Sequence, residues 1–216
     1  SKMMLIVGAL FLISFVWQYF EWRHLLLPPA SSEHGVIIDE LMTFTMLLII
    51  FVFFITQPLL FWYSYKYRKG KGNETAYYFV HHNKLEIIWT VVPAIVLTGV
   101  ILYGLSTWNK ITNADVSDSQ VIELYAQQFN WTARYSGADN TLGSAHYRLV
   151  KGTNALGVNM EDPTASDDKM TREVHLVKGK PILLKFRSQD VIHSAFLPHF
   201  RVQMNCVPGM TTQFAF

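Results

Sequence analysis

The chain has 216 residues, of which 50% are apolar, 14% aromatic and 16% charged, and its formal net charge is +2. This charge fraction is low for a soluble domain of average composition, and the basic residues form no footprint of nucleic-acid binding. The single cysteine, Cys206, excludes an internal disulfide framework and any metal cluster whose several thiolates come from these residues alone.

The first apolar segment is Met3–Phe20, which has no charged residue and follows Lys2. Secretory signals and membrane helices share this pattern. The bulky sequence WQYFEWRH comes next and offers no small-residue cleavage site, so we interpret the segment as a retained transmembrane helix with an aromatic belt. The segment Leu25–Glu40 contains two adjacent prolines and is predicted to form a loop.

Two longer apolar segments follow. Leu41–Tyr65 is uncharged and contains Pro58, which predicts a kinked membrane helix. Leu85–Trp108 carries one charge, that of Glu86 near its start, and is long enough to cross a bilayer. A carboxylate at this place suits the helix dipole, so Glu86 taken alone is interpreted as an interfacial residue.

The loops between these segments differ in charge. The loop 66–84 has Lys66, Arg68, Lys69 and Lys71 against Glu74, whereas the loop 21–40 has four acidic residues against Arg23. Because positive loops face the cytoplasm, we expect loop 66–84 and the N-terminus to be cytoplasmic and the region after Trp108 to lie outside.

From Gln120 the apolar pattern changes to that of strands. Strands are predicted within 121–127, 130–136, 172–179, 181–188 and 190–197, and the fold class of this part is an antiparallel all-β sandwich or barrel. The polar, glycine-rich tract Gly137–Thr171 is too long for a tight hairpin and is predicted to be a surface excursion.

Residues able to bind a metal gather near the end of the sequence: His193, His199, Met204, Cys206 and Met210. Imidazole, thiolate and thioether together are typical ligands of copper. Each methionine and the cysteine, taken singly, is more typical of core packing. His193 is the best candidate ligand because it lies in a strand-like segment beside a loop. The other histidines show no ligand spacing.

Four short motifs occur together: LEIIWTVVP at 85–93, QQFNW at 127–131, DVIHS at 190–194 and VPG at 207–209. In combination they resemble subunit II of haem-copper oxidases and, more narrowly, cytochrome c oxidase subunit II. The resemblance implies a transmembrane hairpin at 41–108 and a cupredoxin-like sandwich at 119–216 on the outer face. The segment 1–24 is then an extra N-terminal transmembrane helix, the third in the chain.

The resemblance also implies the function of an aa3-type or caa3-type oxidase subunit in a bacterial inner membrane, with the β domain in the periplasm. Electrons from cytochrome c, or from a dedicated or tethered cytochrome, would enter a binuclear copper centre, Cu(A). They would pass to haem a and Cu(B) in subunit I, where oxygen reduction is coupled to proton pumping. Subunit I, the other subunits and membrane lipids are the expected partners, and nucleic acid is not.

Individual residues match positions of that family. Glu86 matches a carboxylate at the mouth of a proton path, the K channel, and His193 matches the first histidine ligand of Cu(A). Asp190 matches an acidic position of the cytochrome c surface, and Trp131 matches the second aromatic of a WxW motif. Phe129 stands where the family has the tryptophan of electron entry, which is consistent with an altered donor.

The segment CxxxCxxxHxxM, which carries the other Cu(A) ligands in that family, is absent, and Cys206 matches neither copper cysteine. Since the strand-like TTQFAF reaches Phe216, we expect a C-terminal continuation that completes the domain and the copper site. Three alternatives stay open: a quinol oxidase subunit II without Cu(A), an anchoring subunit, and a blue-copper carrier that uses His193, Cys206 and Met210. The last lacks the second histidine that its spacing requires.

Overall fold

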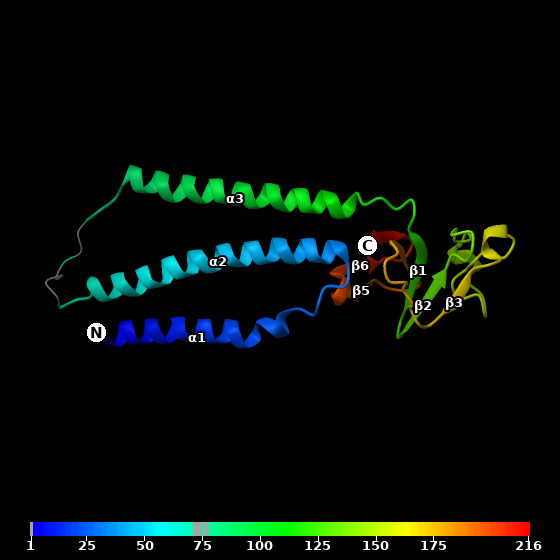
Figure 1. The fold of residues 1–216 in the computed structure, drawn as a ribbon, viewed down its shortest axis with the longest axis horizontal. Coiled ribbons are helices and arrows are strands. Elements are labelled where there is room, and N and C mark those ends of the chain that lie inside the picture. Colours follow the sequence, from blue (N-terminus) through cyan, green and yellow to red (C-terminus); the bar gives the residue numbers. More distant parts are fainter. Residues whose placement is uncertain (1, 71–74, 76–77) are drawn as a thin grey trace. The chain divides into compact units, whose positions relative to one another are not determined.

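The computed structural model describes residues 2–70, 75 and 78–216 of the chain. The chain divides into two compact units, one comprising Ser1–Pro29 and Ile37–Thr107 and the other Ala30–Val36 and Trp108–Phe216. Figure 1 shows the long helices and the β domain. Lys71 and Glu74 of the loop used above for orientation lie outside the described residues.

The three helices are α1 (Lys2–Leu26), α2 (Glu33–Lys66) and α3 (Asn83–Thr112). Among the described residues, α2 and α3 are long and apolar enough to cross a membrane, whereas the apolar part of α1, Leu5–Glu21, is shorter. The spans predicted at 41–65 and 85–108 are therefore confirmed as helices capable of crossing. Most of their large apolar side chains are exposed, so lipid or another protein must cover them.

Aromatic rings join these helices within their own unit. The rings of Phe15 in α1 and Phe53 in α2 stack at 4.5 Å, and those of Phe44 in α2 and Tyr103 in α3 meet edge-on at 5.7 Å. Gly8 of α1 is buried against the ring of Phe61, where an added Cβ would lie 2.6 Å from its Cγ. The glycine allows a close approach of the two helices.

The loop predicted at 25–40 is wrong for residues 25–26 and 33–40, because α1 ends at Leu26 and α2 begins at Glu33. The Ser32 hydroxyl accepts a hydrogen bond from the Gly35 N–H at 3.1 Å, the pattern of a helix N-cap, and donates to the Phe200 carbonyl at 2.9 Å. Ser31 N–H donates to the His199 carbonyl at 2.7 Å. The start of α2 is thus bonded to the β domain.

The β domain contains seven strands among the described residues. Five form one sheet in the order β3-β2-β1-β4-β7, and two form a hairpin. The five are β1 (Gln120–Gln127), β2 (Asn130–Tyr135), β3 (Lys169–Thr171), β4 (Ile182–Ser188) and β7 (Thr212–Ala215), and the hairpin comprises β5 (His193–Leu197) and β6 (Val202–Cys206).

Two strand predictions need correction. The sheet is mixed rather than antiparallel, because β1 pairs with β4 in parallel register. No strand forms at 172–179. There the Tyr135 hydroxyl donates to the His175 carbonyl at 3.0 Å and accepts from the His175 N–H at 2.6 Å. A side chain therefore satisfies the backbone groups that a strand ladder would have paired.

Side-chain alternation along β1 buries both faces of the sheet. Ile122, Leu124 and Ala126 join an aliphatic core that includes Ala195 and Cys206 of the β5–β6 hairpin. Tyr125 points to the other face, where Leu156 and Val158 of the 137–171 excursion cover it. The excursion is therefore packed onto the sheet, and its residues 169–171 form β3.

Candidate functional site

The β1–β2 turn presents two aromatic side chains. Gln127 pairs with Asn130, so Gln128 and Phe129 form a two-residue turn. Phe129 has a φ of 59°, a left-handed conformation unusual for a bulky residue, and its ring is fully exposed. An apolar ring held in solvent by a strained backbone is typical of a contact surface rather than of a core. Trp131 is half-exposed beside it.

Asp190 fixes this turn from the loop after β4. Its Oδ2 accepts a hydrogen bond from the Gln128 N–H at 2.7 Å, and its Oδ1 accepts from the Val191 N–H at 2.7 Å. The His193 Nε2 lies 2.7 Å from the same Oδ1. The hydrogen bond with His193, followed by the two backbone hydrogen bonds, lowers the pKa of Asp190 to about 2. Asp190 is therefore a carboxylate near neutral pH.

His193 begins β5 and lies between Asp190 and Trp131. Its side chain is 16% exposed, and its ring meets the Trp131 ring edge-on at 5.9 Å. A carboxylate on one imidazole nitrogen orients the ring and fixes its tautomer, as it does for many metal-ligating histidines. With Nε2 facing Asp190, a metal would be bound through Nδ1. The structure thus brings together the residues that sequence analysis selected: Phe129, Trp131, Asp190 and His193.

The remaining copper candidates do not join this group. Cys206 pairs with His193 across the hairpin, but its thiol is fully buried and burial raises its pKa to about 11. Met204 packs against the aliphatic core, and Met210 is exposed in the turn after β6. Among the described residues no group of three or more His, Cys, Asp or Glu could hold a metal ion. Residues 1–216 alone therefore do not fit a binuclear copper centre.

Glu86 lies apart from this site, in the first turn of α3. Its Oε1 accepts from the His82 N–H at 3.1 Å, while the His82 Nδ1 accepts from the Leu85 N–H at 3.1 Å. The two residues thus cap the helix reciprocally, as in a capping box. Sequence analysis did not identify this capping role. The available signal was an acidic residue, Glu86, four positions after the polar His82. His81 is also near, with Nδ1 4.0 Å from Glu86 Oε1.

A buried charge network was also missed. Glu123 Oε2 lies 3.0 Å from Arg134 Nε, Glu123 Oε1 lies 2.9 Å from Arg187 Nη1, and Asp168 Oδ2 lies 3.8 Å from Arg134 Nε. The side chains of Glu123, Arg134 and Asp168 are almost fully buried. The sequence contained a signal for this network. A two-residue turn between β1 and β2 places Glu123 opposite Arg134, and opposite charges at such a pair of positions indicate an ion pair.

Comparison with known proteins shows the family of the chain. A family model described as the transmembrane domain of cytochrome C oxidase subunit II matches residues 20–107. The alternative cytochrome c oxidase subunit 2 of Bradyrhizobium diazoefficiens is 30% identical over 188 residues, which cover 86% of this chain and 67% of that protein. The chain belongs to the cytochrome c oxidase subunit II family.

Other members of the family are more distant. Cytochrome c oxidase subunit 2 of Thermostichus vulcanus is 22% identical, with 89% of this chain and 66% of that one covered. This chain thus spans about two thirds of the length of these relatives. The periplasmic domain of subunit II of the Bradyrhizobium japonicum cytochrome oxidase has 24% identity and a TM-score of 0.29, covering 46% of this chain and 64% of that one.

A second solved structure is a mixed-disulfide intermediate between a thioredoxin-like protein and subunit II of cytochrome c oxidase. It has 24% identity to this chain and a TM-score of 0.30, and covers 48% of this chain and 66% of that one. The predicted family is confirmed, and with it the assignment to a subunit of cytochrome-c oxidase with transmembrane helices.

Proposed function

We propose that this chain accepts electrons from cytochrome c, as subunit II of an aa3-type or caa3-type oxidase, at the surface formed by Phe129, Trp131 and Asp190. The supporting observation is the contact of the half-exposed Trp131 ring with the ring of His193 at 5.9 Å. An aromatic ring at the surface that contacts a mostly covered imidazole offers a short route for an electron. Asp190 adds a negative charge for a basic donor.

The proposal includes Cu(A), with His193 as one ligand through Nδ1. Copper would supply one-electron redox chemistry beside Trp131. The two thiolates cannot both come from residues 1–216, which contain only Cys206, so the proposal requires the expected CxxxCxxxHxxM segment after residue 216. Within this chain, Asp190 orients His193 and the aliphatic core holds β5 in place.

In the membrane, we propose that 41–108 forms a hairpin that docks against subunit I, which carries haem a and Cu(B), and that 1–24 adds a third span. The exposed apolar faces of α2 and α3 support such a docking. The N-terminus is assigned to the cytoplasm of a bacterium, the β domain of 119–216 to the periplasm with a cupredoxin-like fold, and Glu86 to the entry of a proton path.

Oxygen consumption by the purified complex with reduced cytochrome c tests the electron-entry surface. Trp131→Leu should lower turnover at least about tenfold, an increase in the barrier of roughly 1.4 kcal/mol. Phe196→Leu is the matched control, because Phe196 is an exposed aromatic of the same domain outside the surface. The rate at which oxygen oxidises the dithionite-reduced complex should be equal in the wild type, Trp131→Leu and Phe196→Leu.

Unchanged turnover in Trp131→Leu would contradict the proposed entry surface. Turnover with a quinol but not with cytochrome c, in a complex without Cu(A), would favour the alternative, a quinol oxidase subunit II. Metal analysis of the same preparation distinguishes a cytochrome c oxidase from a quinol oxidase. Copper in excess of that held by subunit I is expected only for the cytochrome c oxidase, which contains Cu(A).

A further inference from the structure

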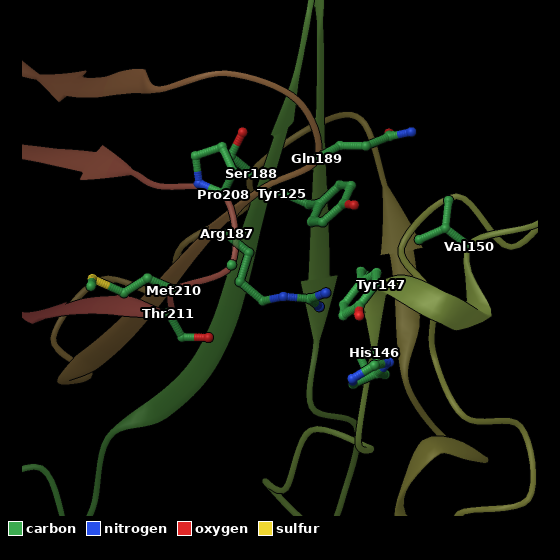
Figure 2. A pocket seen from close by; sticks show the side chains of 12 residues that line it. Tyr125, His146, Tyr147, Val150, Arg187, Ser188, Gln189, Pro208, Met210 and Thr211 are labelled. Carbon is green, nitrogen blue, oxygen red and sulfur yellow. The ribbon is translucent and has the colours of Figure 1, made fainter.

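A cavity of about 750 Å³ lies on the face of the sheet opposite the aliphatic core, between the 145–150 segment and the turn 208–211 (Figure 2). Its floor comprises Tyr125 of β1 and Arg187 of β4. This volume is within the range of small-molecule binding sites. Phe129, Trp131, Asp190 and His193 do not line it, so it is distinct from the proposed electron-entry surface.

The lining of the cavity favours an anion. Arg187 and His146 are its ionisable basic residues, and no Asp or Glu is among the described residues that line it. In Figure 2 the Arg187 side chain extends toward the side lined by Tyr125, His146 and Tyr147. A negatively charged ligand would meet a cation on this floor, and no carboxylate stands among the described residues that line it.

Arg187 shares its carboxylate partner with a second arginine. Glu123 divides its two oxygens between two guanidinium groups, at 2.9 Å from Arg187 Nη1 and 3.0 Å from Arg134 Nε. The second carboxylate, Asp168, lies 3.8 Å from Arg134 Nε. One carboxylate thus serves both arginines directly, and Arg187 has no carboxylate of its own among the ion pairs of the described residues. An anionic ligand would complete the pairing.

Arg187 is also held in a fixed orientation. Its guanidinium lies over the Tyr125 ring at 5.2 Å, and Nη2 donates to the Leu156 carbonyl at 3.3 Å. Together with the bond to Glu123, these contacts use only part of its five N–H donors. The planar guanidinium is therefore pre-organised to donate hydrogen bonds to a carboxylate with little further loss of conformational entropy.

The walls supply an apolar slot. The exposed ring of Tyr147 lies on one side, and Met210, with an exposed thioether, belongs to the turn on the other. The Tyr147 wall is fixed, because the His146 N–H donates to the Gly157 carbonyl at 2.8 Å and the rings of His146 and Tyr147 lie 4.4 Å apart. Aromatic rings and thioethers both pack well against a flat ring.

We propose that this cavity binds a small aromatic carboxylate, with the acid group held by Arg187 and the ring packed between Tyr147 and Met210. Benzoate is the probe. Ligand-observed saturation-transfer NMR on the purified chain in detergent micelles should give a dissociation constant of about 1 mM or below. Benzamide, which lacks the charge, and acetate, which lacks the ring, should each bind at least about tenfold more weakly.

Two variants test the two parts of the site separately. Arg187→Lys keeps a positive charge beside Glu123 but loses the planar fork, and should weaken benzoate binding about tenfold. Tyr147→Ala removes the exposed wall and leaves the buried charge network intact. This variant should weaken benzoate binding about threefold to tenfold. Leu149→Ala is the matched control, since Leu149 lies in the same short turn outside the cavity.

Circular dichroism verifies that each variant keeps its fold. Equal benzoate affinity in the wild type, Arg187→Lys and Tyr147→Ala would overturn the proposal, as would a dissociation constant above about 10 mM in the wild type. Equal affinity for benzoate and benzamide would also overturn it, because the carboxylate would then make no contribution. None of these measurements depends on electron transfer.

Discussion

At the scale of single residues, the β domain depends on buried charges that hold each other in place. Arg134 donates from Nη2 to the Gly143 carbonyl at 2.7 Å and lies beside both Glu123 and Asp168. The network therefore ties the 137–171 excursion to the sheet. Burial, the largest effect, raises the pKa of Asp168, whereas the hydrogen bond from the Gly143 N–H and then the charge of Arg134 act in the opposite direction.

Replacing Arg134 by methionine should destabilise β1 and β2 by about 3–5 kcal/mol, because Glu123 and Asp168 would remain buried without their common cation. Hydrogen exchange of the β1 and β2 amides measures this loss locally. Lys169→Met removes an exposed charge from the neighbouring strand and should leave exchange unchanged. Equal protection in wild type and Arg134→Met would mean that packing alone holds the excursion.

Asp162 predicts an acid dependence of the same excursion. It accepts hydrogen bonds from the Ser144 and Thr164 N–H groups at 2.8 and 3.1 Å, and these bonds, those of Ser144 first, lower its pKa from 3.8. A lowered pKa stabilises the folded state above about 3.8, and the contribution is lost as the pH falls from there towards the folded-state pKa.

Asp162→Asn should therefore lower the melting temperature of the domain at pH 7. The difference from the wild type should shrink as the pH falls below about 3.8, and calorimetry from pH 7 to lower pH follows it. Asp118→Asn, an exposed acid outside the excursion, is the control. A difference that stayed constant as the pH fell would contradict a role for the charge of Asp162.

At the scale of the elements, the positions of α2, α3 and most strands could be predicted, because long uncharged runs and alternating apolar residues determine them directly. Strand direction could not be predicted, since the alternation in β1 and β4 is the same for a parallel or an antiparallel pair. The start of α2 was missed because Ser32 is stabilised as an N-cap by residues far away in sequence, Phe200 among them.

The candidate site was predicted in its composition but not in its contacts. The positions of Trp131, Asp190 and His193 came from motifs, which contain no information on the 2.7 Å contact that makes Asp190 the support of both the turn and the imidazole. Arg187 and Tyr147 were not selected at all. They lie on different elements, and only the packing of the excursion onto the sheet brings them to one cavity.

The packing of α1 on α2 gives a prediction for this pair of elements. Gly8→Ala would place a Cβ 2.6 Å from Phe61 Cγ, so the helices should separate or the ring should move, at a cost of about 1–3 kcal/mol. A photo-crosslinking amino acid at Phe15 should then label α2 less efficiently. Gly99→Ala meets nothing within 4 Å and should leave labelling unchanged. Equal labelling in both variants would contradict close α1–α2 packing.

At the scale of the whole molecule, the chain combines a membrane part and a β domain whose proposed roles differ. The membrane part carries exposed apolar helices that need a partner or lipid, and the β domain carries the aromatic surface proposed for the donor. The two roles can be tested independently, because Glu86 and Trp131 belong to different compact units.

Glu86→Gln tests proton entry without removing the helix cap, because the amide oxygen can still accept a hydrogen bond from the His82 N–H. If Glu86 passes protons, steady-state oxygen consumption should fall about tenfold, whereas electron entry from cytochrome c should be unchanged. Glu40→Gln, an exposed carboxyl on α2, is the matched control. Full turnover in Glu86→Gln at every pH measured would leave Glu86 with the capping role alone, whereas a loss of assembled complex in His82→Ala would show that the cap itself is needed.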